Sequence, residues 1–282
     1  MLLSAALHAG WNLAMRRHGD APAATVLLMS GSCCLILATA LLVGPSADQL
    51  ALAFEWGLLA GLSEGLYFIA LSRALHIGPL APVYAIFRGL PLLILWPASH
   101  LLLGEAIPLR AAGAVALLVA GLVALVPTQS SPAATTTHGY LWAVATAVFN
   151  ALHILVYKAA IVRGAPILPF FGASVLVAVP MAMAVLVPWR RGGAEESAHR
   201  LARAWRGGKL AIVLGALGFT GSFLIALYMM ESQGAAWVLT LRNASIGFSQ
   251  ILGWAVLEER PSQRAFVGVA LVFAGALVLG WG

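Results

Sequence analysis

Ten apolar runs, each near the roughly 20 residues that a helix needs to cross a bilayer, decide what this chain can fold into. They cover about 1–16, 22–43, 52–74, 79–102, 108–126, 138–160, 166–187, 209–231, 235–257 and 261–281. The runs are continuous rather than alternating, which predicts helices instead of the strands of a membrane barrel. With 61% hydrophobic and only 9% charged residues, we interpret the chain as an all-α integral membrane protein.

The remaining composition narrows the class of function. The net charge of +6 lies mainly in loops, so it reports membrane topology and headgroup contact, and we expect no nucleic-acid partner. Neither a metal-binding nor a phosphate-loop motif is present, and we expect no cofactor and no metal. An enzyme with intramembrane His and Glu is the weaker alternative. We expect a non-enzyme, with the lipid bilayer around a monomer or weak dimer, and no cleaved targeting peptide, since the sequence begins inside its first apolar run.

Two stretches are too polar for the bilayer. "PTQSSPAATTTHG" (127–139) is an uncharged linker, and "RRGGAEESAHRLARAWRGGK" (190–209) is basic. The favoured interpretation of the second is a solvated loop near lipid headgroups. Its alternative is a short interfacial helix with Leu201, Ala204 and Trp205 on one face.

The two halves of the chain repeat each other. "ALLVAGLVAL" (116–125) matches "ALVFAGALVL" (270–279) at an offset of 154, and the same offset relates Glu105 to Glu259. Five spans per half is an odd number, so the second copy must enter the membrane from the opposite side. The sequence therefore predicts two inverted five-helix repeats, at 1–127 and 138–282, joined by a linker at 128–137. Secondary transporters have this architecture, with a site at the repeat interface.

One arginine lies inside a span of each half, at matching positions. Arg88 and Arg242 are also related by the offset of 154, and a charge within a span is costly enough that it usually serves function. We expect both guanidinium groups to face one cavity and to bind an anion such as a carboxylate or phosphonate. In the first of these spans Pro91 removes one helical hydrogen bond, which predicts a bent helix.

Glu64 is the only carboxylate deep in a predicted span. It can bind a proton during transport, or it can pair with a substrate ammonium. The structural alternative is a static salt bridge to Arg88 or Arg242, although one carboxylate cannot neutralise two arginines.

Other candidates are polar or aromatic side chains that recur in matching helices. His8, Trp11 and Asn12 share one face of the first span, and Asn150, His153 and Tyr157 share one face of the sixth. Hydrogen-bonded packing is an equally weighted alternative for the two histidines. The predicted substrate-binding residues are Arg88, Arg242, Tyr84, Asn243, Trp11, Asn12, Asn150, His153 and Tyr67, and the predicted proton-coupling residues are Glu64 and His8. The row of Gly57, Gly61 and Gly65 predicts close helix packing.

These residues resemble one known family. "HAGWN" (8–12), "RGLP" (88–91) and the two repeat ends at 101–125 and 241–280 resemble the EamA-type transporters of the drug/metabolite transporter superfamily. The resemblance covers essentially the whole chain and implies export or exchange of a small metabolite at the inner membrane of a bacterium, through protons or the substrate gradient. It also implies that both termini lie in the cytoplasm. The distribution of Lys and Arg among the loops predicts the opposite.

From these features we expect a secondary transporter for a small anionic or zwitterionic metabolite, such as an amino acid, a carboxylate or a phosphonate. A flippase for a lipid or lipid-linked headgroup is the alternative, because an arginine-lined cavity also suits a phosphorylated headgroup. A lateral opening toward lipid would favour the flippase.

Overall fold

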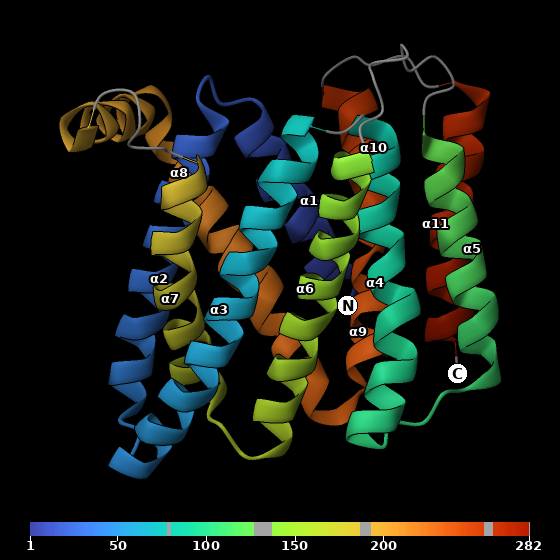
Figure 1. Cartoon of the computed structure of the whole chain (residues 1–282), viewed down its shortest axis with the longest axis horizontal. Helices are drawn as coiled ribbons and strands as arrows, with labels where there is room; N and C mark the ends of the chain where they lie inside the picture. The colour runs from blue at the N-terminus through green and yellow to red at the C-terminus, as the bar shows by residue number, and fades with distance from the viewer. Residues whose placement is uncertain (78–79, 127–136, 187–192, 257–261, 282) are drawn as a thin grey trace.

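The computed structural model describes residues 1–77, 80–126, 137–186, 193–256 and 262–281, and every regular element in these ranges is a helix (Figure 1). The helices are α1 (Leu2–Arg16), α2 (Ala21–Val43), α3 (Ala47–Ile77), α4 (Leu80–Leu103), α5 (Leu109–Leu125), α6 (Thr137–Val162), α7 (Ile167–Leu186), α8 (Gly193–Ser232), α9 (Ala235–Arg242), α10 (Ala244–Val256) and α11 (Gln263–Gly280). Within the described residues, seven are long and apolar enough to cross a membrane: α2, α3, α4, α6, α7, α8 and α11. An all-helical, multi-pass membrane protein is confirmed.

The other three predicted spans form shorter helices. Helix α1 has 15 residues and α5 has 17, while the run at 235–257 is divided into α9 and α10 at Asn243. The predicted single helix there is interrupted at one residue, Asn243, whose amide donates to the carbonyls of both Leu239 and Thr240, so that the last turn of α9 is tightened before α10 begins. Residues 127–136, which include most of the predicted linker at 128–137, lie outside the described residues, and so does Glu259, which the offset of 154 relates to Glu105.

The interpretation of 190–209 as a solvated loop was wrong for its described part, since α8 already begins at Gly193. The helix kinks at Gly208, whose φ of −166° and ψ of 41° are not helical. His18 fixes this kink. Its Nδ1 accepts the Asp20 amide and its Nε2 donates to the Ala204 carbonyl at 3.0 Å, while a Cβ on Gly208 would come within 2.8 Å of the imidazole Nε2.

A second set of contacts holds the part of α8 before Gly208 against the other helices. Arg200 donates from Nη2 to the Asp20 carboxylate at 2.8 Å, and Asp20 also caps the first turn of α2 through the Ala23 amide. The hydrogen bond from Arg200 lowers the pKa of the Asp20 carboxyl, although burial opposes this shift. Ala204 is buried in a small apolar cluster with Ala23 and Val26 of α2.

Successive spans from α2 onward run in alternating directions, and the segment of α8 before Gly208 lies across one end of the bundle (Figure 1). Helix α3 packs on α6 and α7, α2 on α7 and α8, α1 on α8 and α10, α4 on α6, and α5 on α11. The arginine-bearing helices α4 and α9 therefore lie beside α6 and α1, which begin the two halves.

The glycine row on α3 lets that helix approach α7 closely. A Cβ on Gly61 would lie 2.5 Å from the Ser174 carbonyl oxygen and 2.6 Å from the Val177 Cβ, and Gly57 and Gly65 face α7 in the same way. The first of these neighbours is backbone, which cannot rotate away. The predicted packing role of the row is confirmed.

We expect Gly61→Ala to destabilise the protein by about 1–3 kcal/mol, because the new methyl group overpacks the α3–α7 contact. The gain in helix propensity, about 1 kcal/mol, offsets only part of this cost. The matched control is Gly113→Ala, since a Cβ at that helical position of α5 would meet nothing within 4 Å. The free energy of unfolding in mixed micelles measures both. Equal stability of the two variants would show that α3 and α7 are not closely packed.

Candidate functional site

Arg242 ends α9 and is buried, with 8% of its surface exposed. Its guanidinium carbon lies 3.8 Å from the ring centroid of Phe223 on α8, and its Nη2 lies 3.2 Å from Nδ1 of His8 on α1. The division between α9 and α10 places this charge at a helix end inside the protein. Stacking on an aromatic face and a single histidine contact leave most of the guanidinium donors free for another acceptor.

Arg88 occupies the middle of α4 and is half-buried. Its guanidinium carbon lies 5.7 Å and 5.5 Å from the ring centroids of Tyr84 and Phe87, both on the same helix. Pro91 lies inside α4 and has no amide proton to donate to the Phe87 carbonyl, so the helix lacks one backbone hydrogen bond beside Arg88. Arg88 and Arg242 are close enough to repel each other.

Buried nitrogens without a hydrogen-bond partner identify the polar site. In the described part of the chain there are four of them, and all belong to predicted site residues: Trp11 Nε1, Arg88 Nε, His153 Nδ1 and Arg242 Nε. Buried polar atoms in folded proteins are nearly always satisfied, so each exception needs a reason. The three from Trp and Arg can only donate, which makes the site chemically suited to an acceptor such as an anion.

Arg242 is the centre of this group of residues. It interacts electrostatically with Arg88, Glu64, Tyr157 and Tyr67. Arg242 also interacts electrostatically with His8 and His153. The site thus draws residues from α1, α3, α4, α6 and α9, and so from both halves of the chain.

Glu64 lies on α3 and is 2% exposed, but it does not form the salt bridge that the sequence left open as the structural alternative. Its Oε2 accepts hydrogen bonds from the Tyr157 hydroxyl and the Ser174 hydroxyl, each at 3.4 Å. The two hydroxyls also lie 3.1 Å from each other. Among the described ion pairs, none joins Glu64 to Arg88 or Arg242. The static salt bridge was therefore a wrong alternative, and neither arginine is neutralised by this carboxylate.

Aromatic side chains form a wall beside the charges. Trp11 meets His8 edge-on at 5.1 Å and Phe219 at 5.5 Å, and Phe219 lies 4.6 Å from Phe223 between ring centroids. Phe171 stacks on Phe223 at 5.4 Å. The wall gives the site an apolar surface next to its donors, the combination typical of small-molecule sites.

The other predicted residues lie in different surroundings. Asn12 donates to the His8 carbonyl on its own helix at 2.7 Å, so its amide stabilises α1 locally. Asn243 is buried at the junction of α9 and α10, and Asn150 is half-buried on α6. The ring of Tyr84 lies near the Arg88 guanidinium, and Tyr67 interacts electrostatically with both Arg88 and Arg242. Ser174 and Phe223 were missed. An offset of 156 relates "IALSRAL" (69–75) to "IALYMME" (225–231) and so relates Tyr67 to Phe223. This match is a signal that could have identified Phe223.

Lys158 lies buried within α6. Its Nζ donates to the carbonyls of Met230 and, at 2.9 Å, Gln233, and it lies 3.7 Å from Glu105 Oε1. Both carboxylate oxygens of Glu105 accept the Ala235 amide at the start of α9, at 3.0 and 2.9 Å. This ion pair joins the α4–α5 connection of the first half to α6, α8 and α9 of the second.

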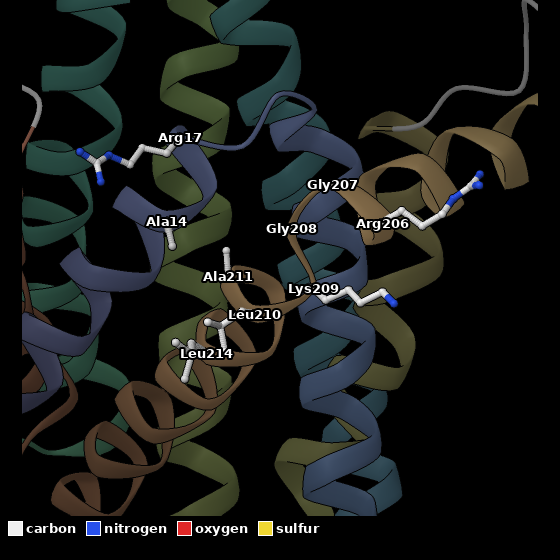
Figure 2. A pocket seen from close by; sticks show the side chains of 9 residues that line it. All are labelled: Ala14, Arg17, Arg206, Gly207, Gly208, Lys209, Leu210, Ala211 and Leu214. Carbon is white, nitrogen blue, oxygen red and sulfur yellow. The ribbon is translucent and has the colours of Figure 1, made fainter.

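The hollow that Figure 2 shows lies elsewhere. It has a volume of about 800 Å³ and is lined by residues of α1 and of α8 around the Gly208 kink. None of the predicted site residues lines it.

A family model described as the EamA-like transporter family matches residues 137–281. Among the solved structures, 29 chains match, including one described only as "Crystal structure of protein". That structure is 19% identical, with a TM-score of 0.71 over 98% of this chain and 93% of its own, and at this identity it shows the fold alone. No curated protein matches the sequence.

Proposed function

Because this chain belongs to the EamA-like transporter family, we propose that it is a secondary transporter for a small anionic or zwitterionic metabolite in the inner membrane of a bacterium. Amino acids, carboxylates and phosphonates fit this description, moved by export or by proton-coupled exchange. The observation that carries the proposal is the pair of buried arginine Nε atoms, Arg88 and Arg242, for which the described protein supplies no acceptor. A bound anion would offset this positive charge, in full only if it is doubly charged, and could accept hydrogen bonds from both arginines.

The proposal includes two inverted repeats, and the helix contacts support it. In this relation α1, α2, α3, α4 and α5 of the first half correspond to α6, α7, α8, the α9–α10 pair and α11 of the second. The α3–α6 contact then corresponds to α8–α1, the α3–α7 contact to α8–α2, and the α4–α6 contact to that of α1 with α9 and α10. All of these pairs pack against each other. The α2–α7 and α5–α11 contacts are each exchanged with themselves.

The glycines between α5 and α11 repeat this symmetry in detail. A Cβ on Gly121 would lie 2.7 Å from the Gly268 carbonyl oxygen, and one on Gly275 would lie 2.7 Å from that of Ala114. The offset of 154 relates Gly121 to Gly275 and Ala114 to Gly268. A two-fold axis between the halves would make these two contacts equivalent, so their reciprocity supports the proposed inverted repeats.

A matched set of probes tests the substrate class. Benzoate, phenylalanine, phenylphosphonate and benzylamine share a ring and differ in charge, and succinate and threonine lack the ring. The purified protein is screened for thermal stabilisation by each, and then for counterflow in liposomes. We expect at least one anion or zwitterion to raise the melting temperature in proportion to the logarithm of its concentration, and benzylamine to have no effect.

Stabilisation by benzylamine alone, or by none of the six, would contradict an anion or zwitterion as the substrate. Movement of a labelled phospholipid between the leaflets of the same liposomes, without counterflow of any probe, would instead support the lipid flippase.

We expect Glu64 to carry the coupling proton. Its carboxylate is buried, contacts two hydroxyls instead of an arginine, and can gain a proton without breaking an ion pair. Glu64→Gln should abolish the response of transport to an imposed pH gradient, while counterflow exchange survives. The matched control is Glu55→Gln, which changes an exposed carboxylate on the same helix.

Full proton dependence in the Glu64 variant would show that this carboxylate does not couple. His8 and His153, which also lie near Arg242, would then be tested in the same assay.

A further inference from the structure

The charges around Arg242 do not balance within the described residues. Arg88 and Arg242 bring two positive charges into the spanning helices, and Glu64 is the only described carboxylate with which Arg242 interacts electrostatically. The other carboxylates of the described ranges are exposed or pair with a different cation. Two arginines and an ionised Glu64 leave one positive charge unmatched, and protonation of Glu64 leaves two.

The remaining polar neighbours cannot supply the missing negative charge. His8 and Tyr67 each interact electrostatically with both arginines, so these four side chains share one region. The Nδ1 atom of His8 accepts from Arg242 Nη2 at 3.2 Å, and a histidine is neutral or positive in every protonation state. Tyrosines are ordinarily neutral at physiological pH. The compensating charge must therefore come from a ligand.

The surroundings of Glu64 suit both the carboxylate and the carboxylic acid. The hydroxyls of Tyr157 and Ser174, each 3.4 Å from Oε2, can donate to the first or accept from the second. The other ionisable groups that interact with Glu64 are Tyr67 on its own helix and Arg242 on α9, and α7, which contributes Ser174, has no titratable side chain. Protonation of Glu64 thus exchanges donor and acceptor roles without breaking an ion pair.

Resting on the transport function proposed above, we propose that the substrate carries two negative charges and binds together with one proton on Glu64. Loaded in this way, the two arginines and the dianion balance each other. A single carboxylate would leave one buried arginine unmatched, which is costly. A dianion beside an ionised Glu64 would leave one negative charge in excess, so the dianion and the proton favour each other's binding. Dicarboxylates and monoesters of phosphate or phosphonates share this chemistry.

Matched probes that differ by one charge test the first part. Succinate is compared with succinamate, and phenylphosphonate with its monomethyl ester, by isothermal titration above neutral pH, where the first member of each pair is doubly charged. We expect the better dianion to bind about 10-fold more tightly than its monoanionic partner, or more, which is the effect of one charged hydrogen-bonding group. A preference within the first pair indicates a dicarboxylate, and within the second a phosphate or phosphonate group.

The pH dependence of binding tests the second part. As the pH rises through the range in which Glu64 ionises, the affinity for the dianion should fall by up to about 10-fold per pH unit, because each bound dianion then takes up one proton. Titrations in two buffers of different ionisation enthalpy measure this proton directly. Glu64→Gln imitates the protonated acid and should bind the dianion without proton uptake. The matched control is Glu55→Gln, an exposed position on the same helix, which should behave like wild type.

Three results would overturn this proposal: equal affinity for the two members of both pairs, no proton uptake by wild type at any pH at which the ligand is a dianion, or full proton uptake by Glu64→Gln. Tighter binding of a monoanion or zwitterion, lost in Arg242→Gln, would overturn it and leave the transport function intact. Binding of no anion or zwitterion at all would contradict both.

Discussion

Replacement of Arg242 by glutamine is expected to lower the affinity for the stabilising anion by about 10- to 100-fold, because a hydrogen bond to a charged group contributes about 1.5–3 kcal/mol. The same loss is expected for Arg88→Gln. Arg242→Lys should retain only part of the affinity, since an ammonium cannot offer a planar fork to a carboxylate or phosphonate. Isothermal titration with the best of the six probes gives the affinities.

The stability of the unliganded variants separates a binding role from a structural one. Arg88 and Arg242 repel each other and are not neutralised by Glu64, so removal of one charge relieves repulsion and desolvation. We expect each single variant to be at least as stable as wild type without ligand, and less stabilised by the anion. Arg264→Gln, an exposed arginine on α11, is the control. A large loss of unliganded stability together with normal anion affinity would show that the arginines serve packing.

The second large effect concerns Lys158 and Glu105. Lys158→Met should lower the free energy of unfolding by about 3 kcal/mol, because it leaves a largely buried carboxylate and two backbone carbonyls without their cation. Glu105→Gln should cost less, since the amide oxygen can still accept from Ala235. The double variant should be more stable than the sum of the single effects predicts. The control Arg203→Met, which removes an exposed cation on α8, should be neutral.

This pair also has an expected effect on transport. It fixes the start of α9, the helix that carries Arg242, to the connection between α4 and α5. Loosening it should raise the rate of exchange or of leak in liposomes at the expense of stability. If the double-mutant cycle shows no coupling and transport is unchanged, the two residues act independently, and this end of the protein is held by other contacts.

The sequence predicted the charged centre of the site because that part of the signal is local or repeats. An arginine inside an apolar run is conspicuous, and the offset of 154 relates Arg88 to Arg242 without any structure. The stripe of histidine, tryptophan and asparagine on α1 and that of asparagine, histidine and tyrosine on α6 were visible because helical spacing places their members on one face.

The partners of these residues could not be predicted, because they come from distant segments. Tyr157 and Ser174 contact Glu64 from positions 93 and 110 residues away. Lys158 lies near the end of an apolar run, where a lysine normally reaches the headgroups, and only the position of the α8–α9 turn shows that it is buried. The helix before Gly208 was underestimated because its charge suggested solvent, whereas its anchor is Asp20 in another segment.

The reciprocal glycine contacts between α5 and α11 have an evolutionary consequence. On the proposed two-fold relation, the fifth helix of each half packs against its own counterpart, as it would in an antiparallel homodimer of a single half. A duplicated and fused gene can inherit such an interface unchanged. After fusion each half could diverge alone. In this chain one arginine lies in the proline-containing α4 and the other at the end of α9, so two positions related by the offset of 154 have different backbones around them, which on the proposed function suits a molecule with two unlike ends.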